Sequence, residues 1–134
     1  RPPRSTLFPY TTLFRSPELD TLVVPVGGGG LISGCAVAAR GLKPSLKIYG
    51  VEAESFSALR QILAGETVTA GGDTIAEGIA VRDIGKLPLE LCRKLLEKVV
   101  SVDEIMIERA IWMARTVSSP STAADRKLKL MAGG

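Results

Sequence analysis

The sequence predicts an α/β fold in which a parallel sheet is flanked by helices. Short runs rich in β-branched residues alternate along the chain with segments of helical periodicity. Glycines and prolines mark most of these changes, and 46% of the 134 residues are hydrophobic, which is enough for one modest core. Strands separated by helices predict parallel pairing through right-handed crossovers.

The first half of the chain predicts two strands, each followed by a helix. The run TLVVPV at 21–26 predicts a short strand that is buried on both faces. A helix rich in small residues is expected over 30–40, where a glycine ends it. The second strand is expected over 47–52, and the short helix after it over 57–64.

A loop and an amphipathic helix are expected next. The loop covers 66–81 and contains several glycines. The helix covers 87–98, and Leu87, Leu91 and Leu95 recur in it every four residues. This spacing predicts that the three leucines face the core.

The last predicted elements are a strand and two helices. The strand is expected over 99–102, and the spacing of Ser101 and Glu104 is that of a capping box. The box predicts that a helix begins here and continues to Val117. Its expected buried stripe consists of Ile107, Ala110, Ile111 and Ala114. A final helix is expected over 122–131.

The charge and the cysteines exclude several classes of protein. The net charge of +3 comes from residues 1–16, which contain three arginines and no acidic residue. The other 14 basic residues balance 14 acidic ones, so no nucleic-acid partner is expected. The apolar runs are too short to cross a bilayer, so no membrane partner is expected. Cys35 and Cys92 are too far apart for a metal-binding pair and predict reduced thiols in a cytoplasmic protein.

The first segment, RPPRSTLFPYTTLFRS at 1–16, has neither strand nor helix periodicity. It resembles the translation of sequencing-adapter DNA, and we interpret it as an artefact or a disordered tail. The folded domain is therefore expected over 17–134.

Four consecutive glycines follow the first predicted strand, in the stretch VVPVGGGGLISG. Gly27, Gly28, Gly29 and Gly30 open directly into a predicted helix, which brings free backbone N–H groups and the positive end of the helix dipole to one point. Glycine also removes the Cβ atoms that would hold an anion away from these groups. The pattern predicts a phosphate site, and the alternative is a purely structural turn.

Other phosphate motifs fit this loop less well. A nucleoside-triphosphate loop needs Lys and then Ser or Thr after the glycines, where this chain has Leu31 and Ile32. The dinucleotide pattern G-x-G-x-x-G misses its third glycine by one position. Glu52, however, lies at the end of the next predicted strand, near the position where an acid that binds ribose is expected. A dinucleotide-binding α/β module therefore stays an alternative.

Four segments resemble, in the same order, the fold-type II pyridoxal-phosphate enzymes, in the branch of threonine/serine dehydratases (threonine ammonia-lyases) and serine racemases. The segments are VVPVGGGGLISG, IYGVEAES, DTIAEGIAVRDIGKLP and VVSVDEIMIERAI. The resemblance implies that residues 17–134 are part of the large α/β domain of such an enzyme. It also implies pyridoxal 5′-phosphate as the cofactor and a small amino acid as the substrate.

The same resemblance implies which residues hold the cofactor. The amides expected to bind its phosphate are those of Gly27, Gly28, Gly29, Gly30 and Leu31. Gly78 is expected along the cofactor ring and follows Glu77, where the family has aspartate. In racemase-like members the acid at Glu52 helps to hold a divalent cation, but a further ligand position is Ala58 here, which offers no side-chain oxygen. The alternative for Glu52 is a structural carboxylate at a strand end.

The implied parent enzyme is a lyase that deaminates L-threonine or L-serine to a 2-oxo acid and ammonia. In this family the Schiff-base lysine lies upstream of the glycine loop, and no lysine precedes the loop here. We therefore interpret the sequence as an internal fragment with no catalytic residue of its own, inactive alone and derived from a cytoplasmic homo-oligomer. Cys35 and Trp112 are interpreted as packing residues. The alternative is a non-catalytic phosphate- or dinucleotide-binding module.

Overall fold

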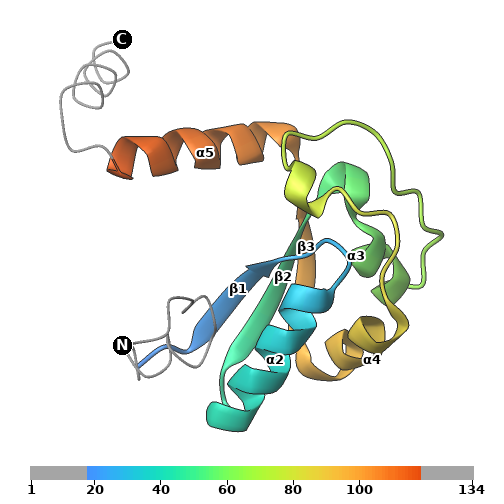
Figure 1. Cartoon of the computed structure of the whole chain (residues 1–134), viewed down its shortest axis with the longest axis vertical. Helices are drawn as coiled ribbons and strands as arrows, with labels where there is room; N and C mark the ends of the chain where they lie inside the picture. Colours follow the sequence, from blue (N-terminus) through green and yellow to red (C-terminus); the bar gives the residue numbers. More distant parts are fainter. Residues whose placement is uncertain (1–17, 119–134) are drawn as a thin grey trace, which may run out of the picture.

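The computed structural model describes residues 18–118 and confirms the predicted parallel sheet. Its strands are β1 (Thr21–Pro25), β2 (Lys47–Ala53) and β3 (Lys98–Val102). They lie in the order β1-β2-β3, and both pairings are parallel (Figure 1). Gly50 in the central strand lies opposite Val24 on one side and Val99 on the other. The carboxyl ends of all three strands therefore meet at one edge of the sheet.

Four α-helices and two short 3-10 helices lie between and after the strands within the described range. They are α2 (Gly30–Leu42), η1 (Glu54–Phe56), α3 (Ala58–Leu63), η2 (Glu77–Ile79), α4 (Lys86–Leu95) and α5 (Glu104–Ser118). Their order is the predicted one, and the helix predicted over 122–131 lies outside the described residues. None of the helices within 18–118 has both the length and the apolar character needed to span a membrane.

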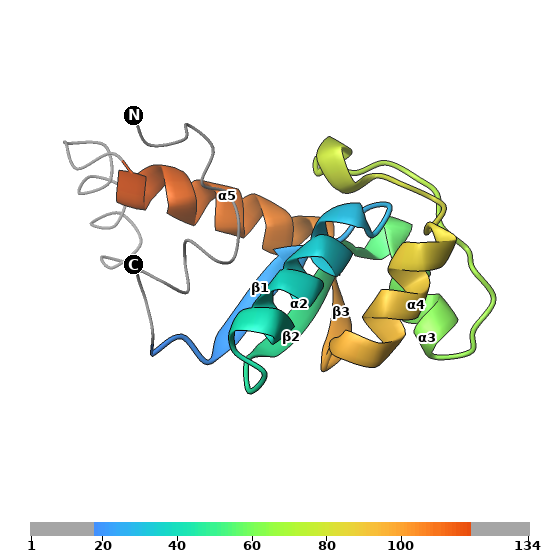
Figure 2. The same cartoon turned by 60° about the horizontal axis from the view of Figure 1, so that its bottom comes forward.

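Helices α2 and α4 lie side by side, and α2 covers one face of the sheet (Figures 1 and 2). The main core lies between these elements and consists of Val24, Val26, Ile32, Cys35, Leu59, Cys92 and Val99. A second cluster under the end of α2 consists of Ala36, Ala39, Leu46 and Ile48. One apolar layer therefore holds β1, α2 and α4 together.

Gly50 in the central strand is a point of close approach to Ile32 on α2 and to Val26 after β1. A Cβ atom at this position would lie 2.9 Å from Val26 Cγ2, 3.0 Å from Ile32 Cδ1 and 3.2 Å from Val99 Cγ2. Contacts under 3.0 Å are shorter than carbon atoms tolerate, so a larger residue at this position would push α2 away from β2.

The opposite face of β1 is exposed within the described residues. Val24 is 5% exposed, whereas its neighbour Val23 is 59% exposed and Pro25 is also exposed. The prediction that this strand is buried on both faces is therefore wrong for 18–118. Strands of parallel sheets are usually covered on both faces, and their sequences are therefore apolar throughout. Within 18–118, helices cover β1 on one face only.

Helix α5 leaves the end of β3 and makes few contacts with the other elements (Figure 1). Its predicted buried stripe is wrong for the described residues, because Ile107 is half-buried while Ala110, Ile111 and Ala114 are exposed. Periodicity identifies which face of a helix is apolar, but burial also requires an element that covers this face.

The start of α5 also differs from the prediction, because the helix is capped by Asp103 and not by Ser101. Asp103 Oδ1 accepts a hydrogen bond from Met106 N at 2.8 Å, and its carbonyl accepts one from Ile107 N at 3.1 Å. Ser101 is part of β3, opposite Glu52, and the strand ends at Val102 as predicted, so the cap lies two residues after the first residue of the predicted box. Asp is as good an N-cap as Ser, and the pairing of Ser101 in the strand leaves Asp103 as the cap.

The core-facing side of α4 agrees only in part with the predicted one. Leu95 packs against the second cluster and Leu91 is half-buried, but Leu87 is 65% exposed, so the prediction is wrong for Leu87. Cys92, which the pattern of leucines did not include, is buried, and Leu89 packs against the main core. A pattern based on leucine alone misses the cysteine, which packs as a small apolar residue.

Glu52 holds the short helix α3 against the end of β2. Its side chain is fully buried, Oε1 accepts a hydrogen bond from Leu59 N, and Oε2 accepts one from Arg60 N, both at 2.9 Å. Burial raises the pKa of the Glu52 carboxyl, and the two backbone hydrogen bonds and the Arg60 charge lower it only in part. Glu52 therefore caps the first turn of a helix that lies beyond it in the chain.

We expect Gly50→Ala to lower the free energy of unfolding by about 1–3 kcal/mol, because the added methyl group overpacks the contact between α2 and β2. Urea titration followed by circular dichroism measures the change. Gly34→Ala is the matched control, since Gly34 is exposed within α2 and a Cβ there meets nothing within 4 Å. Equal stability of the two variants would contradict the packing argument.

We expect Glu52→Gln to lower the free energy of unfolding by about 1–3 kcal/mol. The glutamine amide offers one acceptor oxygen to two backbone N–H donors, so one buried donor loses its partner. Urea titration again measures the loss. The control is Glu66→Gln, which weakens an exposed ion pair with Arg60 and should cost less than about 1 kcal/mol. A loss no larger than that of the control would show that the buried carboxylate is not needed as a cap.

Candidate functional site

The glycine loop begins where β1 leaves the sheet. Val26 N still donates to Val51 O at 2.8 Å, and α2 begins four residues later at Gly30. Gly29, the residue before the helix, has φ of +88° and is buried. A Cβ there would lie 2.9 Å from Pro88 Cβ on α4. Both the backbone angle and the neighbouring helix therefore require glycine at this position.

The loop leaves backbone donors free at the start of α2. The first hydrogen bond of the helix runs from Ser33 N to Gly29 O at 3.0 Å. The amides of Gly30, Leu31 and Ile32 precede this bond and have no acceptor in their own helix. They lie at the positive end of the helix dipole and at the carboxyl edge of a parallel sheet, where ligands bind in α/β folds.

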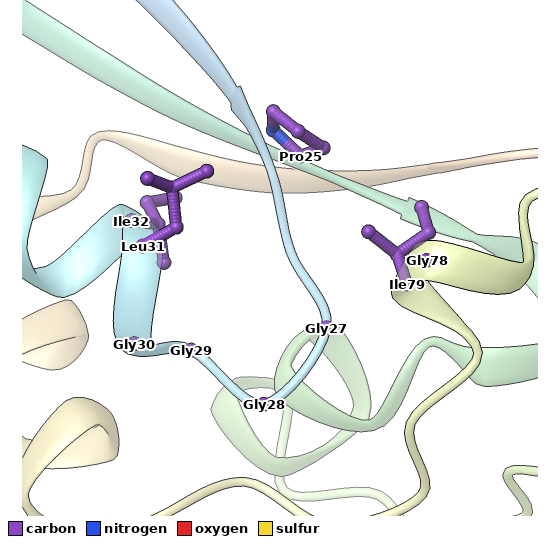
Figure 3. A pocket seen from close by; sticks show the side chains of 9 residues that line it. All are labelled: Pro25, Gly27, Gly28, Gly29, Gly30, Leu31, Ile32, Gly78 and Ile79. Atoms are coloured by element: carbon purple, nitrogen blue, oxygen red, sulfur yellow. The ribbon is translucent and has the colours of Figure 1, made fainter. Parts of the chain in front are cut away.

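A pocket of about 180 Å³ lies in the bend of the loop (Figure 3). Its lining consists of Pro25, Gly27, Gly28, Gly29, Gly30, Leu31, Ile32, Gly78 and Ile79. The structure thus brings together all six residues that the sequence analysis proposed for the cofactor. It adds three apolar residues that the sequence did not indicate, Pro25, Ile32 and Ile79. The only available signal was that Ile32 and Ile79 adjoin predicted residues and that Pro25 lies two positions before Gly27.

The far wall of the pocket comes from the long loop between α3 and α4. Its turn η2 packs against the glycine loop so closely that a Cβ on Gly27 would lie 3.3 Å from Ile79 Cα and 3.2 Å from Val81 Cγ2. Further along, Gly85 N donates to Gly28 O at 3.2 Å. Because the glycines have no side chains, neighbouring segments can pack closely on one side of the glycine loop. The other side of the loop stays open.

The lining of the pocket carries no charge. All nine residues are glycine, proline, leucine or isoleucine. An anion in this pocket would be held by backbone N–H groups and the helix dipole alone. A Cβ added to Gly30 or Gly78 would meet no protein atom within 4 Å, so the space beside these two residues is free for a ligand. The donor set and the missing Cβ atoms fit a phosphate group, which is the part of pyridoxal 5′-phosphate that such a loop can hold.

Glu52 and Glu77 do not line this pocket. Both oxygens of Glu52 accept backbone hydrogen bonds, and no group of three potential metal-ligating side chains occurs within 18–118. The divalent cation predicted at Glu52 is therefore not supported, and the alternative, a structural carboxylate at a strand end, agrees with the observed contacts. Glu77 is exposed on η2.

The two cysteines are free and buried, so the prediction that their thiols are not paired is confirmed. Burial raises the pKa of both thiols, and for Cys92 the nearby Glu52 charge raises it further. Raised pKa values leave little reactive thiolate, which agrees with packing roles. Trp112 on α5 is half-buried and lies outside the pocket lining.

Comparison with known families identifies the family of the chain's residues 10–124. The model described as "Pyridoxal-phosphate dependent enzyme" matches residues 10–124. The match begins inside the adapter-like segment 1–16 and includes every residue of the pocket.

Comparison with curated proteins gives relatives of two kinds. The chain is 41% identical over 97 residues to the L-threonine ammonia-lyase of Thermotoga maritima, covering 71% of this chain and 24% of that protein. It is 35% identical over 117 residues to the serine racemase of Arabidopsis thaliana, covering 86% of this chain and 35% of that protein. The chain thus spans between a quarter and about a third of the length of these relatives.

Among solved structures, maize serine racemase is similar to this chain with a TM-score of 0.72 and 37% sequence identity. The similar region covers 78% of this chain and 33% of that one. Family model, relatives and fold agree. The chain belongs to the family of pyridoxal-phosphate dependent enzymes, and its relatives are threonine dehydratases and serine racemases.

Proposed function

We propose that the pocket between the glycine loop and η2 holds the phosphate of pyridoxal 5′-phosphate in an ammonia-lyase that acts on L-threonine or L-serine. The observation that carries this proposal is the shared pocket, which Gly78 lines together with the four loop glycines and Leu31 although it lies in a distant part of the chain. Gly30 and Gly78 both line this pocket, and a Cβ added to either residue would meet no protein atom within 4 Å.

Each part of the pocket has a separate role in this proposal. The unpaired amides at the start of α2 donate hydrogen bonds to the phosphate oxygens, and the helix dipole stabilises their negative charge. Pro25, Leu31 and Ile79 offer apolar surface beside the phosphate (Figure 3) and reduce the access of water. If bound, pyridoxal 5′-phosphate would supply an electron sink for the α-carbon of the amino acid, which is the chemistry that loss of the α-proton and the β-hydroxyl group requires.

The choice of substrate rests on the relatives. Curated relatives include an L-threonine ammonia-lyase and a serine racemase. Each of these names gives a small amino acid and a reaction on it. We take the lyase as the activity of the whole protein, because the relative at 41% identity carries that name. Within 18–118 no lysine lines the pocket, so we infer that these residues supply the phosphate cradle and not the Schiff-base lysine.

We expect Gly30→Ala and Gly78→Ala each to weaken binding of pyridoxine 5′-phosphate about ten- to one-hundredfold. The added methyl groups enter the open space, and the loss of one hydrogen bond to a charged phosphate corresponds to a change of this size. Equilibrium dialysis or calorimetry on the 134-residue chain measures the affinity. This ligand has no aldehyde, so the lysines of the chain cannot capture it covalently.

The matched control is Gly34→Ala, which adds a methyl group to the same helix on an exposed site outside the pocket. It should leave the affinity unchanged. Two further ligands, NAD⁺ and unphosphorylated pyridoxine, serve as controls. Each should bind to the wild-type chain no more tightly than to the Gly30→Ala variant. Binding of NAD⁺ in preference to pyridoxine 5′-phosphate would instead favour a dinucleotide module.

We expect the 134-residue chain to form no 2-oxobutyrate from L-threonine in the presence of pyridoxal 5′-phosphate, beyond the amount formed by the cofactor alone. The reason is that covalent catalysis with this cofactor requires a lysine at the reacting carbon, and none of the lysines in 18–118 lines the pocket. A coupled dehydrogenase assay measures the product, with the Thermotoga maritima L-threonine ammonia-lyase as the positive control. Turnover that depends on the chain would contradict this assignment.

A further inference from the structure

Glu104 connects helix α5 to the loop that forms the far wall of the pocket. It is the first residue of α5, and its Oε2 accepts a hydrogen bond from Ile75 N at 3.0 Å. Ile75 lies three residues before Gly78. The two bonded residues are 29 positions apart, so this contact joins two segments that the sheet does not join directly.

The segment that Glu104 holds is a compact turn over residues 74–80. Ala76 N donates to Thr74 Oγ1 at 3.1 Å, and Ile79 N donates to Ala76 O at 3.0 Å. These bonds are internal to the turn, so they maintain its shape but do not fix its position. Position comes from contacts with other elements, and the Glu104 carboxylate supplies a charge-assisted one at the start of the turn.

The carboxylate is itself well anchored. β3 pairs with β2 up to Val102, opposite Ala53, and Asp103 caps α5 directly afterwards. Glu104 therefore stands one residue beyond a cap and two beyond the sheet. The other end of the turn contacts the glycine loop, where Ile79 Cα would lie 3.3 Å from a Cβ on Gly27. The 74–80 turn is thus held between Glu104 and the glycine loop.

We propose that Glu104 is a positioning residue of the pocket, which holds Gly78 and Ile79 at the correct distance from the glycine loop. This inference rests on the proposed function, because it assigns Glu104 an effect on the affinity of the phosphate ligand. Glu104 does not line the pocket, so it acts through the turn and not by touching the ligand.

The test compares Glu104→Ala with Glu104→Gln in the 134-residue chain. Both variants remove the same negative charge from the first turn of α5, but only glutamine keeps an oxygen that can accept from Ile75 N. We expect Glu104→Ala to weaken binding of pyridoxine 5′-phosphate about three- to tenfold, as the loss of one hydrogen bond would, and Glu104→Gln to stay within about twofold of wild type. Glu108→Ala, an exposed change one turn further along α5, should have no effect.

A second measurement does not depend on the ligand. Hydrogen exchange of the Ile75 amide, followed by NMR, should be at least about tenfold faster in Glu104→Ala than in the wild type and should be slow again in Glu104→Gln. Equal affinities for the two Glu104 variants would overturn the inference, and so would fast exchange at Ile75 with unchanged affinity. A wild-type chain that binds no pyridoxine 5′-phosphate would overturn the proposed function. Unchanged Ile75 exchange in Glu104→Ala would in turn show that Glu104 does not hold the turn.

Discussion

The close approach of α2 to the sheet at Gly50 is the constraint on which the rest of the structure depends. Val26 and Ile32, the two side chains that a Cβ at Gly50 would meet most closely, stand on either side of the glycine loop. Because both side chains lie against Gly50, the two ends of the loop are held close to β2, and the loop turns between them at Gly29, whose φ is +88°. The pocket is therefore a product of core packing, and a change beneath it would alter its donor geometry.

Local signals predicted the order of the elements and the glycine loop correctly. Both depend on neighbours in the sequence: β-branched runs, a glycine cluster and the helix that follows it. The meeting of Gly78 with this loop came from the family resemblance and not from any local pattern. Ile79 and the hydrogen bond from Ile75 to Glu104 could not be predicted, because they depend on how a long irregular loop returns to the sheet.

The errors about burial share one physical cause, which is that burial is decided by the neighbouring elements and not by the apolar pattern alone. The stripe on α5 and the outer face of β1 are apolar in sequence and exposed in the described residues. Glu52 shows the same limit for a polar residue. An acid at a strand end can hold a ribose, a cation or a helix, and only the positions of the Leu59 and Arg60 amides show that this one holds a helix.

The uncharged lining of the pocket has a consequence for ionic strength. Salt screens interactions between separated charges over a Debye length of about 10 Å at 0.1 M. Hydrogen bonds from fixed amides act at contact distance, so potassium chloride should affect a bound anion only weakly. Sulfate and inorganic phosphate, in contrast, have the shape that these amides recognise, and they would compete directly for them. The occupancy of the pocket would then depend more on which anion the buffer contains than on the ionic strength.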